Sequence, residues 1–157
     1  MTRETTPTQA PAGIDPRGPR VGAGITALLL AVVVLLGAST AGLVLLGVVA
    51  AGFLLGAVRG AQGTVQGWLF KALVRPRLVP PAELEDARPP RFAQLVGLVV
   101  TGVGVVLGLT GVLAAVPWAA GIAFVAAALN AVWGLCLGCE LYLLGARLRR
   151  GGAPTGV

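Results

Sequence analysis

The sequence predicts an all-α integral membrane protein, a four-helix bundle built from two helical hairpins. Hydrophobic residues make up 56% of the 157 residues and charged residues only 11%, whereas a soluble domain has roughly 25% charged residues. The charges also lie almost wholly outside long apolar runs. Because the chain has no His, it lacks the usual general base at neutral pH, so self-contained hydrolytic chemistry is not expected.

The N-terminal half is a polar tail followed by the first hairpin. Residues 1–20 mix Pro, Thr and Gly with charges of both signs, a composition that predicts a disordered cytoplasmic tail. Residues 21–58 carry no charge, and this run is about twice the ~20 residues that cross a bilayer once. It must therefore turn, and its small polar cluster at 37–40 predicts helices over 21–37 and 41–58.

A charged loop, residues 59–91, joins the two hairpins. Its first part alternates basic residues with Trp68, Leu69 and Phe70, which is typical of a segment that lies in the membrane interface. A solvated connector is the alternative interpretation. The basic residues expected to contact lipid headgroups or a protein partner are Arg59, Lys71, Arg75 and Arg77.

The second hairpin begins at another charge-free run, residues 92–116, which predicts the third helix. Pro117 and Trp118 predict the turn, and the fourth helix is expected over 118–146, followed by a cytoplasmic basic tail over 147–157. Residues 21–146 thus form one four-helix transmembrane domain. No residue-by-residue repeat between the two halves is apparent.

The distribution of charge predicts the topology. All 12 basic residues lie in the two tails and the long loop, and none lies in the short connections at 37–40 and near 117. By the positive-inside rule, both termini and the loop are cytoplasmic. We therefore expect a multi-pass protein of the cell inner (plasma) membrane.

The only two cysteines, Cys136 and Cys139, stand just before Glu140, where the apolar run of the fourth helix ends. On one continuous helix their sulfurs would share a face, at a Cα separation that a disulfide accepts. Two thiols at this spacing suit dithiol redox or sulfur transfer, in which one thiolate attacks and the second resolves the mixed intermediate. We expect Cys139, nearer to water, to attack, Cys136 to resolve and Glu140 to move a proton.

Three other interpretations of the pair stay open. The cysteines could pack as small apolar residues, bind a metal completed by a second subunit, or carry palmitate. A position toward the C-terminal end of a helix, beside Glu140, would disfavour the thiolate. Asn130 is expected on the opposite face of that helix, bonded to another helix. The residues predict no cofactor and no resident metal.

Three segments carry a resemblance to a known family: IDPRGPR near the N-terminus, LVRPRL…LEDARPPRFAQLVG in the middle, and CLGCELYLL near the end. Over about residues 14–146 the chain resembles an uncharacterised family of small bacterial four-helix membrane proteins, a domain of unknown function. Its members are often encoded near thioredoxin-like and rhodanese-type proteins, which implies cytoplasmic thiol or sulfur handling. Cys136, Cys139 and Tyr142 match its CxxCxxY pattern, and Asp15, Pro16 and Arg17 its N-terminal pattern.

The sequence therefore predicts an inner-membrane thiol–disulfide or sulfur-transfer relay protein whose CxxC faces the cytoplasm. Its expected partners are membrane lipid and a thioredoxin-like or sulfurtransferase protein, with no nucleic acid. One alternative is a non-catalytic membrane scaffold or assembly subunit of a larger complex. Another is a small oligomeric transporter, although the spans lack the ionisable residues typical of such pathways. Enzymatic activity and homo-oligomer formation are left open.

Overall fold

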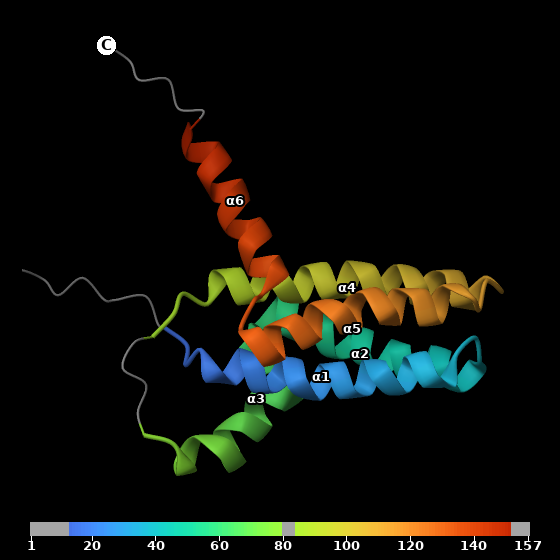
Figure 1. The fold of residues 1–157 in the computed structure, drawn as a ribbon, viewed down its shortest axis with the longest axis horizontal. Coiled ribbons are helices and arrows are strands. Elements are labelled where there is room, and N and C mark those ends of the chain that lie inside the picture. Colours follow the sequence, from blue (N-terminus) through green and yellow to red (C-terminus); the bar gives the residue numbers. More distant parts are fainter. Residues whose placement is uncertain (1–12, 80–83, 152–157) are drawn as a thin grey trace, which may run out of the picture.

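Four long helices form the body of the protein in a computed structural model that describes residues 13–79 and 84–151 (Figure 1). Each is long and apolar enough to cross a membrane, which confirms the predicted all-α four-helix membrane bundle. These helices are α1 (Arg17–Leu36), α2 (Thr40–Arg59), α4 (Arg88–Leu109) and α5 (Ala115–Trp133). The remaining segments are η1 (Ala61–Gly63), α3 (Val65–Leu69), the π-helical η2 (Phe70–Val74), η3 (Arg75–Arg77) and α6 (Leu137–Gly151).

The outer surface of the bundle is strongly apolar. Leu28, Leu35 and Leu109 are 71%, 85% and 73% exposed, and extended apolar exposure of this kind marks a surface that contacts lipid or another apolar phase. The buried core lies between α1, α2 and α5 and consists of Leu30, Val33, Leu46, Val49, Val116, Ala119, Ala120 and Ala123. The chain is therefore a multi-pass membrane protein that turns its large apolar side chains outward.

Glycines of α4 allow its neighbours to approach closely. A β-carbon on Gly104 would overlap the β-carbon of Ala119, and one on Gly108 would lie 2.6 Å from Cδ1 of Leu43. Small residues one turn apart are the usual means by which membrane helices bring their backbones together. These two positions fix α4 against α5 and α2.

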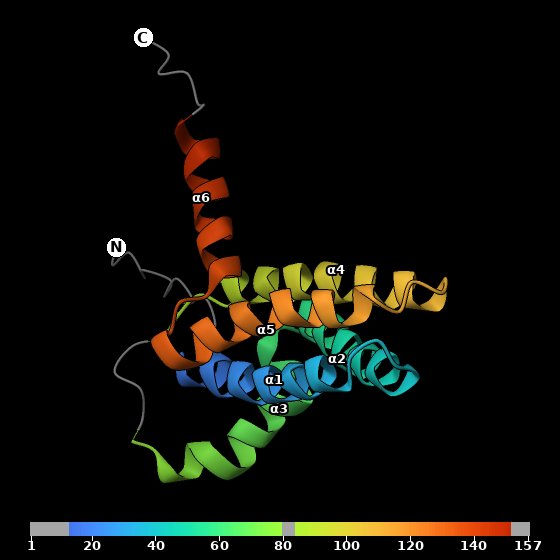
Figure 2. The ribbon, with the colours of Figure 1, turned by 45° about the vertical axis from the view of Figure 1, so that its right-hand side comes forward.

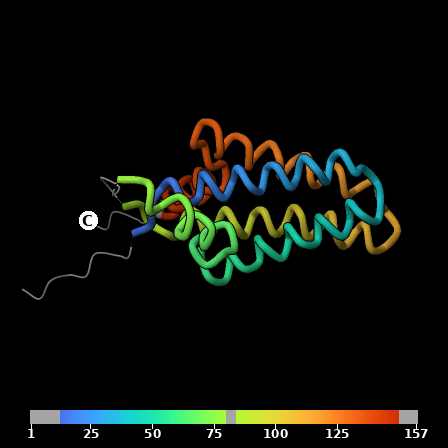
Figure 3. The backbone as a smooth tube through the Cα atoms, turned by 90° about the horizontal axis from the view of Figure 1, so that it is seen from below, coloured from blue at the N-terminus to red at the C-terminus, as the bar shows by residue number. Residues whose placement is uncertain are grey.

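Both hairpin turns, 37–39 and 110–114, lie at one end of the bundle, and the long loop lies at the other (Figure 3). Between the hairpins, α1 packs mainly against α5, and α2 packs mainly against α4. The first helix of each hairpin thus contacts the second helix of the other. The second turn precedes Pro117, so the expected turn at Pro117–Trp118 was wrong: proline is tolerated in the first turn of a helix, and α5 begins at Ala115.

The segments that lead into α1 and α4 repeat one sequence, Asp-x-Arg-x-Pro-Arg, at residues 15–20 and 86–91. In each copy the first Arg donates its backbone N–H to the aspartate, at 3.0 Å in both cases. The two lead-ins meet in an antiparallel bridge, in which Ile14 and Glu85 exchange backbone hydrogen bonds of 2.8 and 3.0 Å. The expectation that the halves share no residue-level repeat was therefore wrong.

The last Arg of each copy caps a helix of the opposite hairpin. Arg91 donates to the carbonyls of Ala57 and Val58, at 2.6 and 2.9 Å, at the end of α2. Arg20 donates to the carbonyl of Val132, at 3.2 Å, at the end of α5. A cation at a helix C-terminus satisfies free carbonyls and complements the helix dipole. The two hairpins are thereby tied together by equivalent contacts.

The terminal segments differ from the expected tails. Residues 13–20, expected within a disordered tail, are ordered by the lead-in bridge, and Ile14 is 4% exposed. At the other end, the predicted basic tail begins inside a helix, because α6 continues to Gly151. The rest of the two tails, residues 1–12 and 152–157, lies outside the described residues.

Candidate functional site

A glycine ends α5 just before the cysteine pair. Gly134 has a φ of 71° and a ψ of 11°, a left-handed conformation, and its N–H donates to the carbonyl of Asn130 at 3.0 Å. Glycine adopts this conformation without a β-carbon penalty and commonly terminates helices. The single helix expected over 118–146 was therefore wrong: the chain breaks at residues 134–136 and resumes as α6.

Cys136 occupies the position immediately before the first residue of α6. Its carbonyl accepts the backbone N–H of Glu140 at 3.0 Å, which is the first hydrogen bond of the helix. Its Sγ accepts the backbone N–H of Cys139 at 3.4 Å. This is the arrangement of an N-cap residue, whose side chain satisfies a free N–H of the first turn.

The two cysteines form a disulfide, with their Cα atoms 5.2 Å apart, and both residues are half-buried. Because Cys136 precedes α6, the expectation that both lie on one helical face near a helix C-terminus was wrong. The helix dipole at this end favours a negative charge, so it favours the thiolate of the reduced pair. Reactive cysteines commonly occupy this position at a helix N-terminus.

The first hairpin has a matching cap without sulfur. Thr64 precedes α3, and its hydroxyl accepts the backbone N–H of Gly67, three residues on, at 3.0 Å. Gly60, which ends α2, has a φ of 82°, as Gly134 has a left-handed φ at the end of α5. After the second hairpin Cys136 makes a similar capping bond before α6, with Cys139 three residues on. Each hairpin is thus followed by a capped helix, and in the second case the cap is the first cysteine of the pair.

Two contacts hold α6 against the start of α4. A β-carbon on Gly138 would lie 2.5 Å from Cα of Ala93, so the backbones touch there and only glycine fits without movement. One turn on, the ring of Tyr142 packs at a tilt against Phe92, with centroids 5.8 Å apart. From this anchor α6 projects across the long axis of the bundle, on the side opposite α3 (Figure 2).

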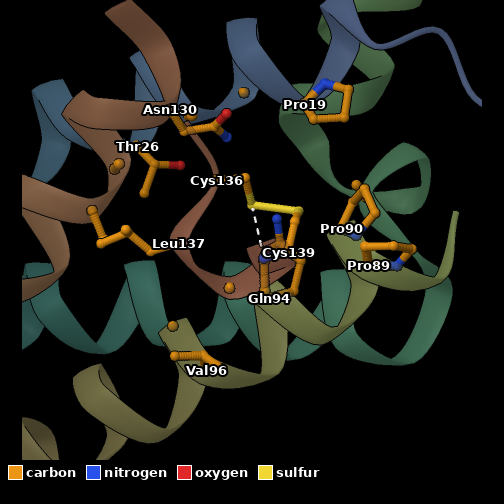
Figure 4. A pocket seen from close by; sticks show the side chains of 18 of the residues that line it. Pro19, Thr26, Pro89, Pro90, Gln94, Val96, Asn130, Cys136, Leu137 and Cys139 are labelled. Atoms are coloured by element: carbon orange, nitrogen blue, oxygen red, sulfur yellow. Dashed lines mark hydrogen bonds between the residues drawn. A yellow bond between two sulfur atoms is a disulfide. The ribbon is translucent and has the colours of Figure 1, made fainter. Parts of the chain in front are cut away.

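A cavity of about 1010 Å³ adjoins the pair, and both cysteines line it (Figure 4). It extends from the lead-ins, near Asp86, into the bundle as far as Thr26 and Val49. Thr26 lies about 14 Å along α1 from Arg17, at 1.5 Å per residue. Glycine and alanine make much of its wall, which is why the space stays open: Gly22, Ala23, Gly52, Ala93, Gly97, Ala126 and Ala127.

Uncharged polar side chains line the same cavity. Asn130 and Thr26 point into it near the disulfide, as Figure 4 shows, and Gln94 and Gln66 contribute from α4 and α3. The expectation that Asn130 lies on the face away from the cysteines was therefore wrong. That expectation assumed one continuous helix. The chain instead breaks at residues 134–136, and this break brings Cys136 to the same cavity as Asn130.

The other predicted site residues divide into two groups. Glu140 is exposed, directly follows Cys139 and lines the cavity. The four basic residues of the lipid- or partner-contact prediction are all exposed at the loop end of the bundle and away from the cavity wall: Arg59, Lys71, Arg75 and Arg77.

Arg20 is a site residue that sequence reasoning missed. Its guanidinium carbon would lie 3.6 Å from a β-carbon on Gly134, so the cation sits over the break, two residues before Cys136. Arg20 also lines the cavity. The repeated Asp-x-Arg-x-Pro-Arg sequence could have identified Arg20. Arg91 occupies the same place in the second copy and caps the end of α2, as Arg20 caps the end of α5.

Comparison with known protein families gives a match over most of the chain. The family described as Domain of unknown function (DUF4395) matches residues 14–147. No curated protein and no solved structure matches the chain.

Proposed function

Because the chain belongs to the DUF4395 family, whose description names no activity, we propose a function from the site itself: membrane-bound thiol–disulfide exchange by Cys136 and Cys139. The observation that carries the proposal is the position of the pair. Cys136 caps the N-terminus of α6 and is within bonding distance of Cys139. At a helix N-terminus the dipole stabilises a thiolate nucleophile, which a cysteine used only for packing does not need.

The proposed reaction is a two-electron exchange. The Cys136 thiolate attacks one sulfur of a partner disulfide, forming a mixed disulfide and releasing the partner's other sulfur as a thiolate. The thiolate of Cys139 then attacks Sγ of Cys136, which closes the internal disulfide and releases the second partner sulfur. The partner is reduced, the pair is oxidised by two electrons, and the reverse sequence oxidises a partner dithiol.

These roles reverse the ones expected from the sequence. Cys139 was expected to attack because it would lie nearer to water along a continuous helix, but Cys136 lies outside the helix and before its first turn. Cys136 also has the Arg20 cation two residues upstream, over Gly134. We assign Glu140 the transfer of a proton to or from Cys139, its chain neighbour.

The proposed partner is a soluble thiol protein of the thioredoxin or sulfurtransferase type, and the proposed side is the cytoplasm of the inner membrane. The positive-inside rule supports that side, because the basic residues flank one end of the bundle and both hairpin turns at the other end are uncharged. The exposed cations Arg59, Lys71, Arg75 and Arg77 are proposed to contact anionic lipid or this partner.

Trapping of mixed disulfides tests the proposal. In membranes of the producing cell, Cys139→Ser should accumulate a reductant-sensitive adduct on Cys136, because the resolving thiol is missing. The matched variant, Cys136→Ser, keeps Cys139 in the same peptide but away from the capping position. It should accumulate far less mixed disulfide than Cys139→Ser. Equal trapping by the two variants would refute the assigned roles. Absence of trapping together with full function of the double Ala variant would favour the scaffold alternative.

A further inference from the structure

We infer that the cavity beside the disulfide binds a lipid-soluble quinone, which exchanges two electrons with the cysteine pair. The inference rests on the proposed dithiol chemistry and adds the second substrate of that site. Four features of the cavity lead to this class of ligand: its access from lipid, its size, its polar groups and its contact with the disulfide.

The cavity opens toward the apolar exterior of the bundle. Its lining includes Ile122 and Val125 of α5, which are 61% and 54% exposed, and Leu141 of α6, which is 55% exposed. Ile122 and Val125 lie on α5, one of the four apolar helices that can cross a membrane, and Leu141 lies on the adjoining α6. A ligand can therefore enter sideways from the membrane between α5 and α6, as an apolar-tailed molecule would.

The size and the polarity of the cavity suit a ring with an apolar tail. A volume of about 1010 Å³ lies at the upper end of the ~300–1,000 Å³ typical of sites for small molecules and cofactors. Apolar side chains and glycines make most of the lining. Its charged side chains belong to the lead-in and to the first turns of α1 and α6: Glu85, Asp86, Arg20 and Glu140. Beyond the first turns of the helices, the described lining residues carry no charge, so a neutral ring fits there better than a headgroup with several charges.

Amide groups are available to hold the ring. Across residues 13–79 and 84–151, no protein group hydrogen-bonds the side-chain amides of Gln66, Gln94 or Asn130. Each amide NH2 group is a hydrogen-bond donor, and all three residues line the cavity. A quinone presents two carbonyl oxygens that accept such hydrogen bonds, and it keeps them as hydroxyls after reduction.

The electron balance closes with these two reactants alone. The thiols of Cys136 and Cys139 lose two electrons and two protons when the disulfide bond forms. The quinone gains two electrons and two protons, and its carbonyl oxygens become the hydroxyls of a quinol. The pair can then accept electrons from a new partner dithiol by exchange, so electrons pass from soluble thiols to the membrane.

A cavity-filling variant tests the inference. Gly52 lines the cavity, and a β-carbon there would have Gln66 Nε2 as its nearest neighbour, at 3.9 Å, so Gly52→Leu places its side chain in the cavity without a clash at Cβ. Gly47 lies on the same helix outside the cavity lining, and a β-carbon there meets nothing within 4 Å. Gly47→Leu is therefore the matched control, because both variants raise helix propensity.

The probe is a short-tailed benzoquinone added without oxygen to the reduced, full-length protein in lipid nanodiscs. Wild type and Gly47→Leu should convert one quinone per protein to quinol while the pair closes. Gly52→Leu should react slower by about tenfold to hundredfold, and its oxidised form should lose binding of the quinone. Equal rates in Gly52→Leu and wild type would overturn the inference, because the reaction would occur outside the cavity.

A second measurement separates this inference from the proposed function. Oxidation of the reduced protein by a soluble aromatic disulfide should proceed at one rate in wild type, Gly52→Leu and Gly47→Leu. If that exchange occurs but the quinone neither binds nor reacts, the quinone site is refuted and the proposed thiol exchange is retained. A lipid acyl chain that fills the cavity would give this result. If neither oxidant closes the pair, both proposals fail.

Discussion

Replacing Gly134 by alanine tests the break that separates α5 from α6. An L-residue in the left-handed conformation of Gly134 costs roughly 1–2 kcal/mol. The nearest atom to the added β-carbon would be the guanidinium carbon of Arg20, at 3.6 Å, so backbone strain acts without a steric clash. The same substitution at Gly121, inside α5, meets nothing within 4 Å and should stabilise the helix by about 1 kcal/mol.

The two alanine variants should therefore differ by about 2–3 kcal/mol, with opposite signs. For a chain of this size 1 kcal/mol shifts the unfolding midpoint by about 2–4 °C, so their midpoints in detergent should be separated by about 4–12 °C. Asparagine, which tolerates the left-handed region, should be less harmful than alanine at 134. If Gly134→Ala stabilises as much as Gly121→Ala, α5 and α6 form one helix, and Cys136 does not occupy a helix N-terminus.

Two further variants test the surroundings of the pair. Gly138→Val should push α6 away from Ala93, which lowers stability by about 1–3 kcal/mol and speeds proteolysis of α6. Gly145→Val, whose β-carbon meets nothing within 4 Å, should change neither stability nor proteolysis. Equal proteolysis of the two variants would contradict the docking of α6. Arg20→Gln should slow alkylation of reduced Cys136 about two- to fivefold at low salt and less at high salt. An Arg20→Gln rate equal to wild type would show that this cation does not stabilise the thiolate.

The four spans could be predicted from the sequence because charge-free runs of membrane length leave few alternatives. Residues 21–58, for example, are too long for one crossing and too apolar for a loop. The observed helices begin and end within a few residues of most expected bounds. The first hairpin turn followed from the same reasoning. The second lies at 110–114, before Pro117, which stands in the first turn of α5.

The break before the cysteines could not be predicted, because nothing local distinguishes Gly134 from the other 23 glycines of the chain. Apolar residues continue on both sides of it, and the hydrophobic pattern alone reads as one helix. Tertiary contacts flank this glycine: Gly138 docks on Ala93, and Arg20 donates to the carbonyl of Val132. These contacts join segments that are far apart in sequence.

The repeated Asp-x-Arg-x-Pro-Arg, by contrast, can be detected in the sequence alone. The apolar runs that follow its two copies share no matching pattern, so hydrophobic periodicity alone does not reveal it. With the repeat aligned, the cap that Arg91 provides to α2 implies the cap that Arg20 provides to α5. The cavity had no sequence signal, since its small lining residues are those that also serve close helix packing.

Sidedness-resolved alkylation in native membranes tests the central claim, that Cys136 and Cys139 cycle between dithiol and disulfide at the basic end of the bundle. These are the only cysteines, so an impermeant, mass-adding maleimide reports on the pair alone. Inverted vesicles should gain label after prior reduction, and right-side-out vesicles should gain none. Full labelling without reductant, or no labelling on either side after reduction, would contradict the account.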